Sequence, residues 1–315
     1  CSYLTQVGLC ARDYLSRDVD TSLSGGEVKR IEIATLLAKN SRIMIFDEPE
    51  AGIDLWSFAR LTETFRELHE KGGRTILIIS HQERILSIAD EIVVLSKGVQ
   101  DYFKDTYGRE TRFIPNGVNR PEIQSAKLIT EKFDLTKDSY ILFLGRLVPE
   151  KGLRYLIEAF KAVKTNKKLV IAGGSSDTST YMNRLKKMAS EDERIIFTGF
   201  VQGKMLEELY SNALIYCLPS DLEGMPLSLL EAMSYGNCCL TSNISECAEV
   251  VEDKAVTFEK GNVNDLKKKI ERLLSHEEEI KKYKKQAADF ICTKYNWDNV
   301  VEETIKVYKG EKENG

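Results

Sequence analysis

The sequence predicts an α/β protein made of two units, each with a parallel sheet. Short apolar runs such as IMIF at 43–46 and YILFL at 140–144 are typical of buried strands, and they alternate with stretches whose apolar residues recur at helical spacing. Strands that alternate with helices form parallel sheets, with ligands at the carboxyl ends of the strands. The 315 residues are enough for two domains with separate cores.

Composition favours a soluble globular protein. Hydrophobic residues make up 42% and charged residues 30%, and no run approaches the roughly 18 apolar residues of a membrane-spanning helix. The first residues lack the layout of a signal peptide, so we expect a cytoplasmic protein without a transmembrane segment. The net charge of -4 gives no reason to expect nucleic-acid binding.

Cysteine and histidine usage argues against a metal centre. The seven cysteines lack paired CxxC spacing, and the three histidines are scattered, so we expect neither a disulfide framework nor a metal site. Cys238 and Cys239 follow Gly236 as a buried strand would, which favours core packing over redox chemistry.

A glycine-rich helix start opens the first unit. Ser24, Gly25 and Gly26 precede a stretch with apolar residues at helical spacing. The free N–H groups and the positive dipole end of such a helix can bind an anion. An ordinary N-cap is the alternative.

Two carboxylates follow the first predicted strand. Asp47 and Glu48 come directly after IMIF, an arrangement that suits a magnesium ligand followed by a general base. After another helical stretch, TILIIS at 75–80 predicts a second buried strand that ends at His81. A lone histidine there is more often structural than functional.

In this order, the segments resemble the signature, Walker B, D-loop and switch regions of ABC ATPases. DEPEAGIDLWSFARL is most similar to the ATPase of the Suf iron–sulfur assembly system. The resemblance covers the rear half of such a domain and implies a signature loop, a magnesium-associated aspartate, a general base, a D-loop residue and a switch histidine: Ser24, Gly25, Gly26, Glu27, Asp47, Glu48, Asp54 and His81.

The features that complete an ABC domain are missing from the sequence. It has no GxxxxGK(S/T) motif, so we expect ATPase activity to be absent and Mg-ATP to be met only if a partner supplies a P-loop. A domain without its first strands would leave an unpaired edge and an uncovered apolar face. We therefore expect a homodimer, a P-loop ATPase partner or marginal stability.

Two cations follow the strand at 140–144 in the second unit. Arg146 and Lys151 lie between that strand and an amphipathic helix that begins at Leu153. From there they can neutralise a diphosphate without a metal, although solvated surface charge is the alternative. Further predicted strands at 168–172, 194–197 and 213–218 continue a Rossmann-like unit.

The stretch LPSDLEGMPLSLLEAMSYG carries two spaced carboxylates. Glu223 precedes a helix expected to begin near Pro226, and Glu231 lies more than one turn inside it. At a rise of about 1.5 Å per residue, the carboxylates are separated by roughly the length of a diphosphate. One can meet a sugar and the other a ribose. Two surface glutamates would explain neither the glycine nor the proline.

Residues from about 100 to 310 resemble the C-terminal, donor-binding domain of GT-B glycosyltransferases of family 4, in which this stretch is the E-x7-E motif. The resemblance implies retaining, metal-independent transfer from a nucleoside-diphosphate sugar, with no further cofactor. It implies catalytic roles for Arg146, Lys151 and Glu223, and a donor pocket formed by Gly173, Phe200, Val201, Gly224, Met225, Pro226, Leu227 and Glu231.

The predicted organisation is therefore an ABC fragment at 1–97 and a donor-binding domain at 98–315, with a seam near 88–99. The family also needs an acceptor-binding domain, which residues 1–95 do not resemble, and its motif here reads EGMPLS. Donor binding is expected, whereas complete transfer needs that missing domain. The alternatives are an ATPase-associated interaction protein and an inactive fusion that only binds nucleotide.

Overall fold

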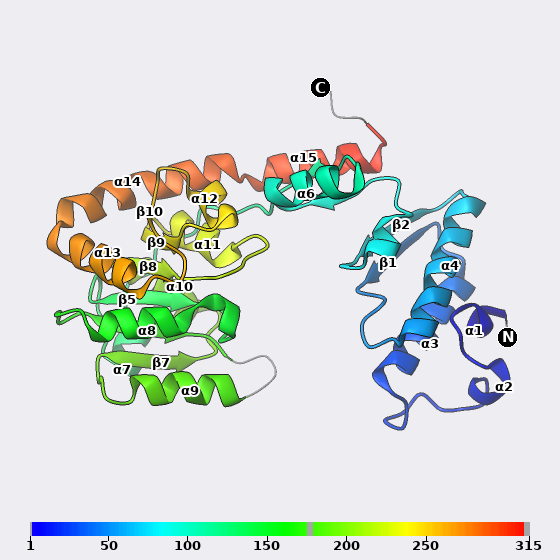
Figure 1. The fold of residues 1–315 in the computed structure, drawn as a ribbon, viewed down its shortest axis with the longest axis horizontal. Coiled ribbons are helices and arrows are strands. Elements are labelled where there is room, and N and C mark those ends of the chain that lie inside the picture. The colour runs from blue at the N-terminus through cyan, green and yellow to red at the C-terminus, as the bar shows by residue number, and fades with distance from the viewer. Residues whose placement is uncertain (1, 175–178, 312–315) are drawn as a thin grey trace. The chain divides into compact units, whose positions relative to one another are not determined.

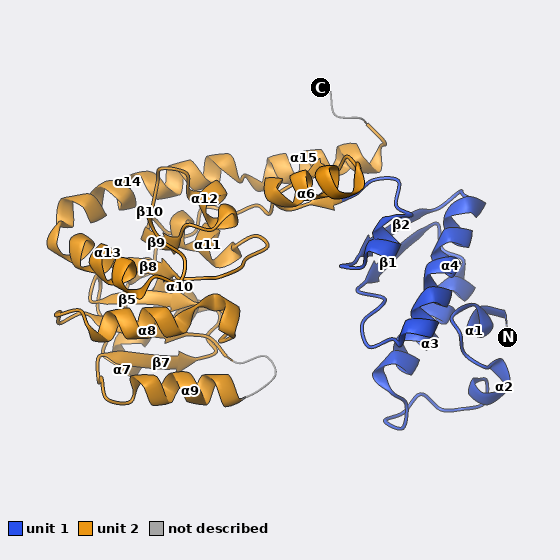
Figure 2. Cartoon of the chain, in the orientation of Figure 1, with its two compact units in different colours: residues 1–92 blue, residues 93–315 orange. Residues whose placement is uncertain are grey.

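The chain is described by a computed structural model over residues 2–174 and 179–311. It divides into two compact units, residues 1–92 and 93–315 (Figures 1 and 2). Each unit has its own hydrophobic core.

The first unit packs a two-stranded parallel sheet against helices. The helices are α1 (Ser2–Gln6), α2 (Ala11–Tyr14), α3 (Gly25–Lys39), α4 (Leu55–Lys71) and α5 (Glu83–Leu86). Strands β1 (Ile43–Asp47) and β2 (Thr75–Ile79) pair in parallel. Met44 and Phe46 of β1 lie in the core with Leu61 and Phe65 of α4. The predicted succession of helix, strand, helix and strand is thus confirmed.

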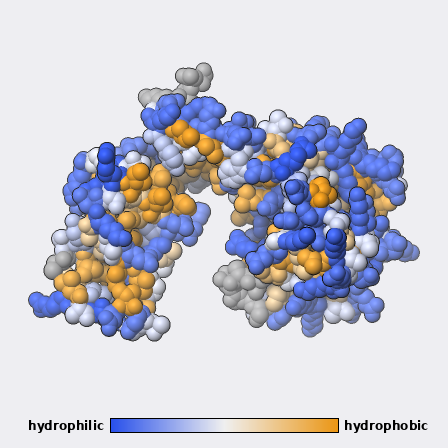
Figure 3. All heavy atoms as spheres, turned by 180° about the vertical axis from the view of Figure 1, so that it is seen from behind, coloured by the Kyte–Doolittle hydropathy of each residue, from blue (hydrophilic) through white to orange (hydrophobic). Residues whose placement is uncertain are grey.

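One face of this sheet is open, so the prediction that both strands are buried was wrong. Ile43 and Ile45 of β1 are 63% and 64% exposed, and Ile79 of β2 is 57% exposed. Successive residues of a strand face opposite sides, which buries Met44 and Phe46 and leaves the isoleucines uncovered. Figure 3, which views the molecule from behind, also shows apolar residues on the surface of this unit.

We expect the first unit to open more readily than the second. The amides of β1 and β2 should exchange with deuterated water faster than those of β5 and β6 of the second unit, because a two-stranded sheet with one open face is held by few contacts. Hydrogen exchange of the intact chain, followed by mass spectrometry, measures both sheets in one sample. Equal protection of the two sheets would contradict this expectation.

The second unit is built on a six-stranded parallel sheet with the order β10-β9-β8-β5-β6-β7. Its strands are β5 (Tyr140–Leu144), β6 (Lys168–Ala172), β7 (Ile195–Gly199), β8 (Ile215–Leu218), β9 (Cys238–Ser242) and β10 (Val256–Phe258). With β5 as the first strand, this is the doubly wound order 3-2-1-4-5-6, which reverses between β5 and β8. The predicted Rossmann-like architecture is confirmed.

Helices flank this sheet (Figure 1). They are α7 (Leu128–Phe133), α8 (Leu153–Lys161), α9 (Ser179–Ala189), α10 (Lys204–Asn212), α11 (Leu227–Ser234), α12 (Ser245–Val251), α13 (Val263–Ser275) and α14 (Glu277–Lys294), with a 3-10 turn η1 (Pro149–Lys151). Helix α8 packs against α9 and α13, while α14 packs against α11 and β9. These helices bury the strands on both faces, and Tyr140, Ile141, Leu142 and Phe143 of β5 are fully buried.

The stretch around the seam belongs to the second unit from Val93 onward. Strand β3 (Val93–Val94) pairs in parallel with β4 (Arg112–Phe113) across α6 (Lys97–Tyr107). Helix α15 (Trp297–Tyr308) closes the described chain.

The adjacent cysteines are part of the core, as predicted. Cys238 and Cys239 of β9 are 0% and 1% exposed. Burial raises the pKa of the Cys238 thiol to about 12, so it stays protonated at neutral pH.

Candidate functional site

The point where the strand order reverses lies between β5 and β8 of the second unit. In open α/β sheets, ligands bind outside the carboxyl ends of the strands at this position. The loop after β5 carries Arg146 and Lys151, and the loop after β8 carries Glu223. The topology therefore brings the predicted cations and the first predicted carboxylate to one place.

Backbone contacts hold these two loops together. Gly152 has a φ of +63°, and a Cβ at that position would lie 1.9 Å from the carbonyl oxygen of Pro219. The amide of Asp221 donates a hydrogen bond of 2.7 Å to the carbonyl of Glu150. Glycine is required at 152 both by the left-handed backbone and by the close approach of the β8 loop.

Lys151 and Glu223 form a buried ion pair between the loops. The Lys151 Nζ lies 2.7 Å from each carboxylate oxygen of Glu223. The two side chains are only 16% and 6% exposed. The Ser220 hydroxyl donates a third hydrogen bond, of 2.5 Å, to Glu223 Oε1. Both oxygens of this carboxylate are thus engaged.

Arg146 differs from Lys151 in its surroundings. Its side chain is exposed. Within residues 2–174 and 179–311, no group accepts a hydrogen bond from its guanidinium. The two cations that the sequence predicts in one loop are therefore not equivalent, because Lys151 is paired with Glu223 and the Arg146 side chain has no partner among the described residues.

The Glu231 carboxylate accepts a hydrogen bond from the hydroxyl of a buried tyrosine. Helix α11 begins after Pro226 and is anchored by Leu229 and Met233, which are fully buried, while Glu231 faces outward. The Tyr210 hydroxyl donates a hydrogen bond of 2.9 Å to Glu231 Oε2. Burial raises the pKa of Tyr210 well above its ordinary value, which keeps this hydroxyl a donor.

The backbone amides around the start of α11 differ in whether a protein group accepts a hydrogen bond from them. Pro226 has no amide hydrogen, and the amide of Leu227 donates to the carbonyl of Met225 at 2.9 Å. No acceptor in the described part of the chain meets the amides of Gly224 and Met225. The sulfur of Met225 accepts from the amide of Asn116 at 3.1 Å, which ties this loop to the segment that precedes α7.

The remaining predicted pocket residues lie in the loops after β6 and β7. Gly173 has a φ of +144°, and a Cβ there would lie 1.8 Å from the carbonyl oxygen of Gly145. Phe200 is 74% exposed directly after β7, whereas Val201 packs against the core. The structure explains Gly173 by the close approach of two backbones and leaves the Phe200 ring open to solvent.

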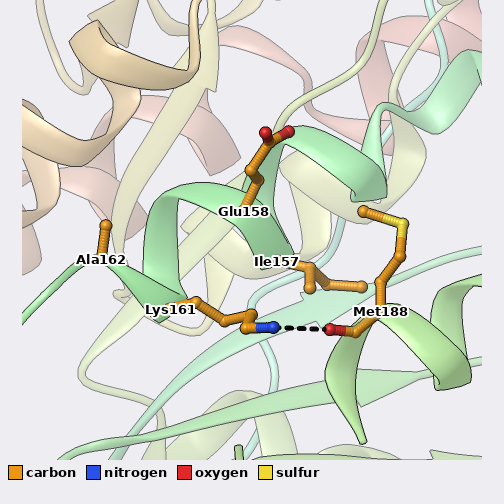
Figure 4. Close-up of a pocket in the computed structure, with 5 residues that line it drawn as sticks. All are labelled: Ile157, Glu158, Lys161, Ala162 and Met188. Atoms are coloured by element: carbon orange, nitrogen blue, oxygen red, sulfur yellow. Dashed lines mark hydrogen bonds between the residues drawn. The ribbon is translucent and has the colours of Figure 1, made fainter. Parts of the chain in front are cut away.

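A groove elsewhere on the second unit is separate from this site. Figure 4 shows it between α8 and α9, where the Lys161 Nζ donates to the carbonyl of Met188 at 3.1 Å. It is lined by Ile157, Glu158, Lys161, Ala162 and Met188. The α8 residues of this groove lie beyond the first turn of the helix. Because α8 connects β5 to the parallel strand β6, its later turns lie away from the carboxyl edge of the sheet, where the candidate site is.

In the first unit, the predicted base and switch histidine meet. His81 Nε2 lies 3.3 Å from Glu48 Oε1, and both side chains are exposed. Asp47 is also exposed, and its carbonyl accepts from Lys29 Nζ at 2.9 Å. Asp54 is the N-cap of α4, where its carboxylate accepts from the amides of Trp56 and Ser57.

The glycine-rich start of α3 is a capping box. The Ser24 hydroxyl accepts from the amide of Glu27, whose carboxylate accepts from the amide of Ser24. A hydrogen bond from the Tyr14 hydroxyl, followed by those from Ser24, lowers the pKa of Glu27 to about 2. A Cβ on Gly26 would lie 2.4 Å from the carbonyl oxygen of Gly52, while Gly25 is unobstructed. The N-cap alternative accounts for these contacts without a bound anion.

The described residues contain neither a metal-binding cluster nor a membrane-spanning helix. Across 2–174 and 179–311, no group of three or more His, Cys, Asp or Glu side chains is arranged to hold a metal ion. None of the helices in those ranges has the length and apolar character needed to cross a membrane.

Sequence reasoning missed Ser220 and Tyr210, which support the two carboxylates. Ser220 stands between a buried strand and Glu223, where serine is common in any turn. Tyr210 lies in the amphipathic helix α10, where an aromatic residue predicts only core packing. Neither residue type carries a signal of its own at these positions.

Comparison with curated proteins gives two kinds of relative. An uncharacterised glycosyltransferase of Methanocaldococcus jannaschii is 29% identical over 233 residues, covering 70% of this chain and 60% of that protein. An uncharacterised ABC transporter ATP-binding protein of the same organism is 35% identical over 124 residues, covering 36% of this chain and 49% of that protein. The chain thus spans less than two thirds of the length of these relatives.

Solved structures share the fold. Sucrose-phosphate synthase from Thermosynechococcus elongatus superposes with a TM-score of 0.73 and 19% identity, over 90% of this chain and 77% of that one. HepE of Anabaena, in complex with UDP and glucose, gives 0.74 and 14%, over 91% and 83%. The likeness establishes the parallel-sheet α/β fold of GT-B glycosyltransferases.

Two family descriptions match the sequence. The ABC transporter description matches residues 2–51, which agrees with the predicted ABC ATPase fragment. The description "Glycosyl transferases group 1" matches residues 126–290, just over half of the 315 residues and all of the candidate site. The chain therefore belongs to the group 1 glycosyl transferase family.

Proposed function

We propose that the second unit binds a nucleoside-diphosphate sugar and, with an acceptor-binding domain, transfers the sugar with retention and without a metal. The observation that carries the proposal is the ion pair of Lys151 and Glu223 at the reversal point of the sheet. Arg146 lies in the same loop as Lys151, and Glu231 lies on the helix that follows Glu223. Cations there can neutralise a diphosphate, and carboxylates can accept hydrogen bonds from hydroxyl groups.

Each residue has a distinct part in this proposal. Arg146 and Lys151 bind the diphosphate, Glu223 faces the transferred sugar, and Glu231 binds the ribose hydroxyls. Gly173, Phe200, Val201 and residues 224–227 border the nucleotide. The UDP complexes of HepE support this reading at the level of the fold, and a mannosyltransferase of Escherichia coli, 26% identical over 187 residues, supports a sugar donor.

A calorimetric titration tests donor binding directly. We expect one of UDP, GDP and ADP to bind the intact chain, with the affinity unchanged when EDTA is added, because protein cations take the place of a metal. The Glu231→Gln variant should weaken binding by about tenfold, since it removes the charged acceptor for the ribose hydroxyls. Absence of binding by all three nucleotides would contradict the proposed function.

The first unit adds separate proposals. A second copy of the chain or a P-loop ATPase could cover its sheet, and the exposed Ile43, Ile45 and Ile79 are the observation that favours such a partner. Mg-ATP would reach the Ser24 loop only through the latter. A cytoplasmic location and the narrower Suf-type likeness also stay predictions.

A further inference from the structure

We propose that Lys151 exchanges partners when the donor binds, so that the site distinguishes a nucleoside-diphosphate sugar from the bare nucleoside diphosphate. In the exchange, the diphosphate takes Lys151 away from Glu223, and sugar hydroxyls replace the lysine at the carboxylate. This inference rests on the proposed function and adds a basis for its selectivity.

Both oxygens of the Glu223 carboxylate accept hydrogen bonds from neighbouring side chains. Glu223 accepts from Lys151 through both oxygens, at 2.7 Å each, and from the Ser220 hydroxyl at 2.5 Å. The Lys151 ammonium has three donors, of which two are used by this carboxylate. Arg146, by contrast, is exposed and offers the first contact to an incoming anion.

The loops around the pair are fixed, so the exchange needs only a side-chain movement. Gly152 lies against the Pro219 carbonyl, and the Asp221 amide is bonded to the Glu150 carbonyl. These contacts keep the turn that carries Lys151 beside the loop that carries Glu223. Lysine can turn about its flexible stem, whereas Glu223, at 6% exposure, stays where it is.

Moving Lys151 away from Glu223 raises the free energy of the buried carboxylate unless other hydrogen-bond donors replace the ammonium group. A carboxylate that is nearly excluded from water and has no cation beside it is strongly disfavoured. A neighbouring diphosphate adds repulsion between like charges. The Ser220 hydroxyl compensates only in part, because it is a single neutral donor.

The sugar provides the missing donors. Its hydroxyls can donate hydrogen bonds to the charged carboxylate, and such bonds are stronger than those between neutral groups. A bare nucleoside diphosphate brings the repulsion without these donors. Binding of the donor is therefore favoured over binding of the diphosphate product, and reformation of the Lys151–Glu223 pair assists release of that product.

The test compares two affinities in two variants. The first ligand is the nucleoside diphosphate that binds the wild-type chain. The second is its sugar conjugate, chosen as the one that binds most tightly among the glucose, galactose, mannose and N-acetylglucosamine conjugates. Glu223→Gln removes the charge and keeps the size, so the bare diphosphate should bind about three- to tenfold tighter while the conjugate gains nothing. Glu231→Gln is the matched control, because it should weaken both ligands equally and leave their ratio unchanged.

A second variant keeps the test sharp if Glu223→Gln is unstable. Ser220→Ala removes the donor that stays at Glu223 after the exchange, so the bare diphosphate should bind about threefold more weakly and the conjugate less so. Wild-type binding with an unchanged ratio in Glu223→Gln, or in Ser220→Ala where Glu223→Gln does not fold, overturns the exchange while the proposed function stands. No binding of any nucleotide by the wild type overturns both.

Discussion

Replacing Lys151 with methionine is expected to lower the free energy of unfolding by about 3–5 kcal/mol, because it leaves the Glu223 carboxylate buried without a cation. Methionine keeps the length of the apolar stem, so the loss reports charge rather than packing. Nucleoside-diphosphate affinity should fall by about a hundredfold in the same variant, since one of the two cations that we propose to bind the diphosphate is gone. Chemical denaturation and calorimetric titration measure the two effects.

The double variant Lys151→Met with Glu223→Gln separates stability from binding. It contains no uncompensated charge, so most of the lost stability should return. Affinity for the nucleotide should stay low, because the cation is still missing. If the double variant were as unstable as Lys151→Met, the buried pair would not be the cause of the loss.

Replacing Gly152 with alanine should destabilise the fold about as much as Lys151→Met, because the backbone leaves no room for a Cβ atom at this position. The new Cβ would lie 1.9 Å from the Pro219 oxygen, at a φ of +63° that alanine disfavours. Either the η1 turn or the β8 loop must shift, and we expect a loss of about 3 kcal/mol or more. Nucleotide affinity should fall in parallel, since Lys151 and Glu223 stand on the two displaced segments.

Gly224→Ala is the control for this variant. It lies in the same site, has no atom within 4 Å of an added Cβ and has no positive φ. Its unfolding midpoint should stay close to that of the wild type, with a change in stability within roughly 0.5 kcal/mol. Comparable destabilisation by both substitutions would show that the strain at 152 is not the determining factor.

The fold of the second unit could be predicted from its sequence because its signals were local and repeated. Apolar runs such as YILFL marked buried strands, and Pro226 marked the start of α11. Glycines after the strands marked the carboxyl edge. The spacing of Glu223 and Glu231 then placed both carboxylates near the start of one helix.

What the sequence could not provide was the identity of neighbours distant along the chain. Ile45 is as apolar as Met44, yet one is exposed and the other buried, because only the tertiary structure decides which faces of a strand are covered. Arg146 and Lys151 are both basic, but only Lys151 lies opposite Glu223. Supporting residues such as Tyr210 are invisible to motif spacing for the same reason.

The four charged side chains that recognise the donor in our proposal all belong to one unit. Arg146, Lys151, Glu223 and Glu231, together with Ser220 and Tyr210, lie after Val93 in the chain. Recombination that exchanged everything before Val93 would leave each of them and its supports untouched. The contacts among the residues that we propose for donor binding therefore do not depend on which segment precedes Val93.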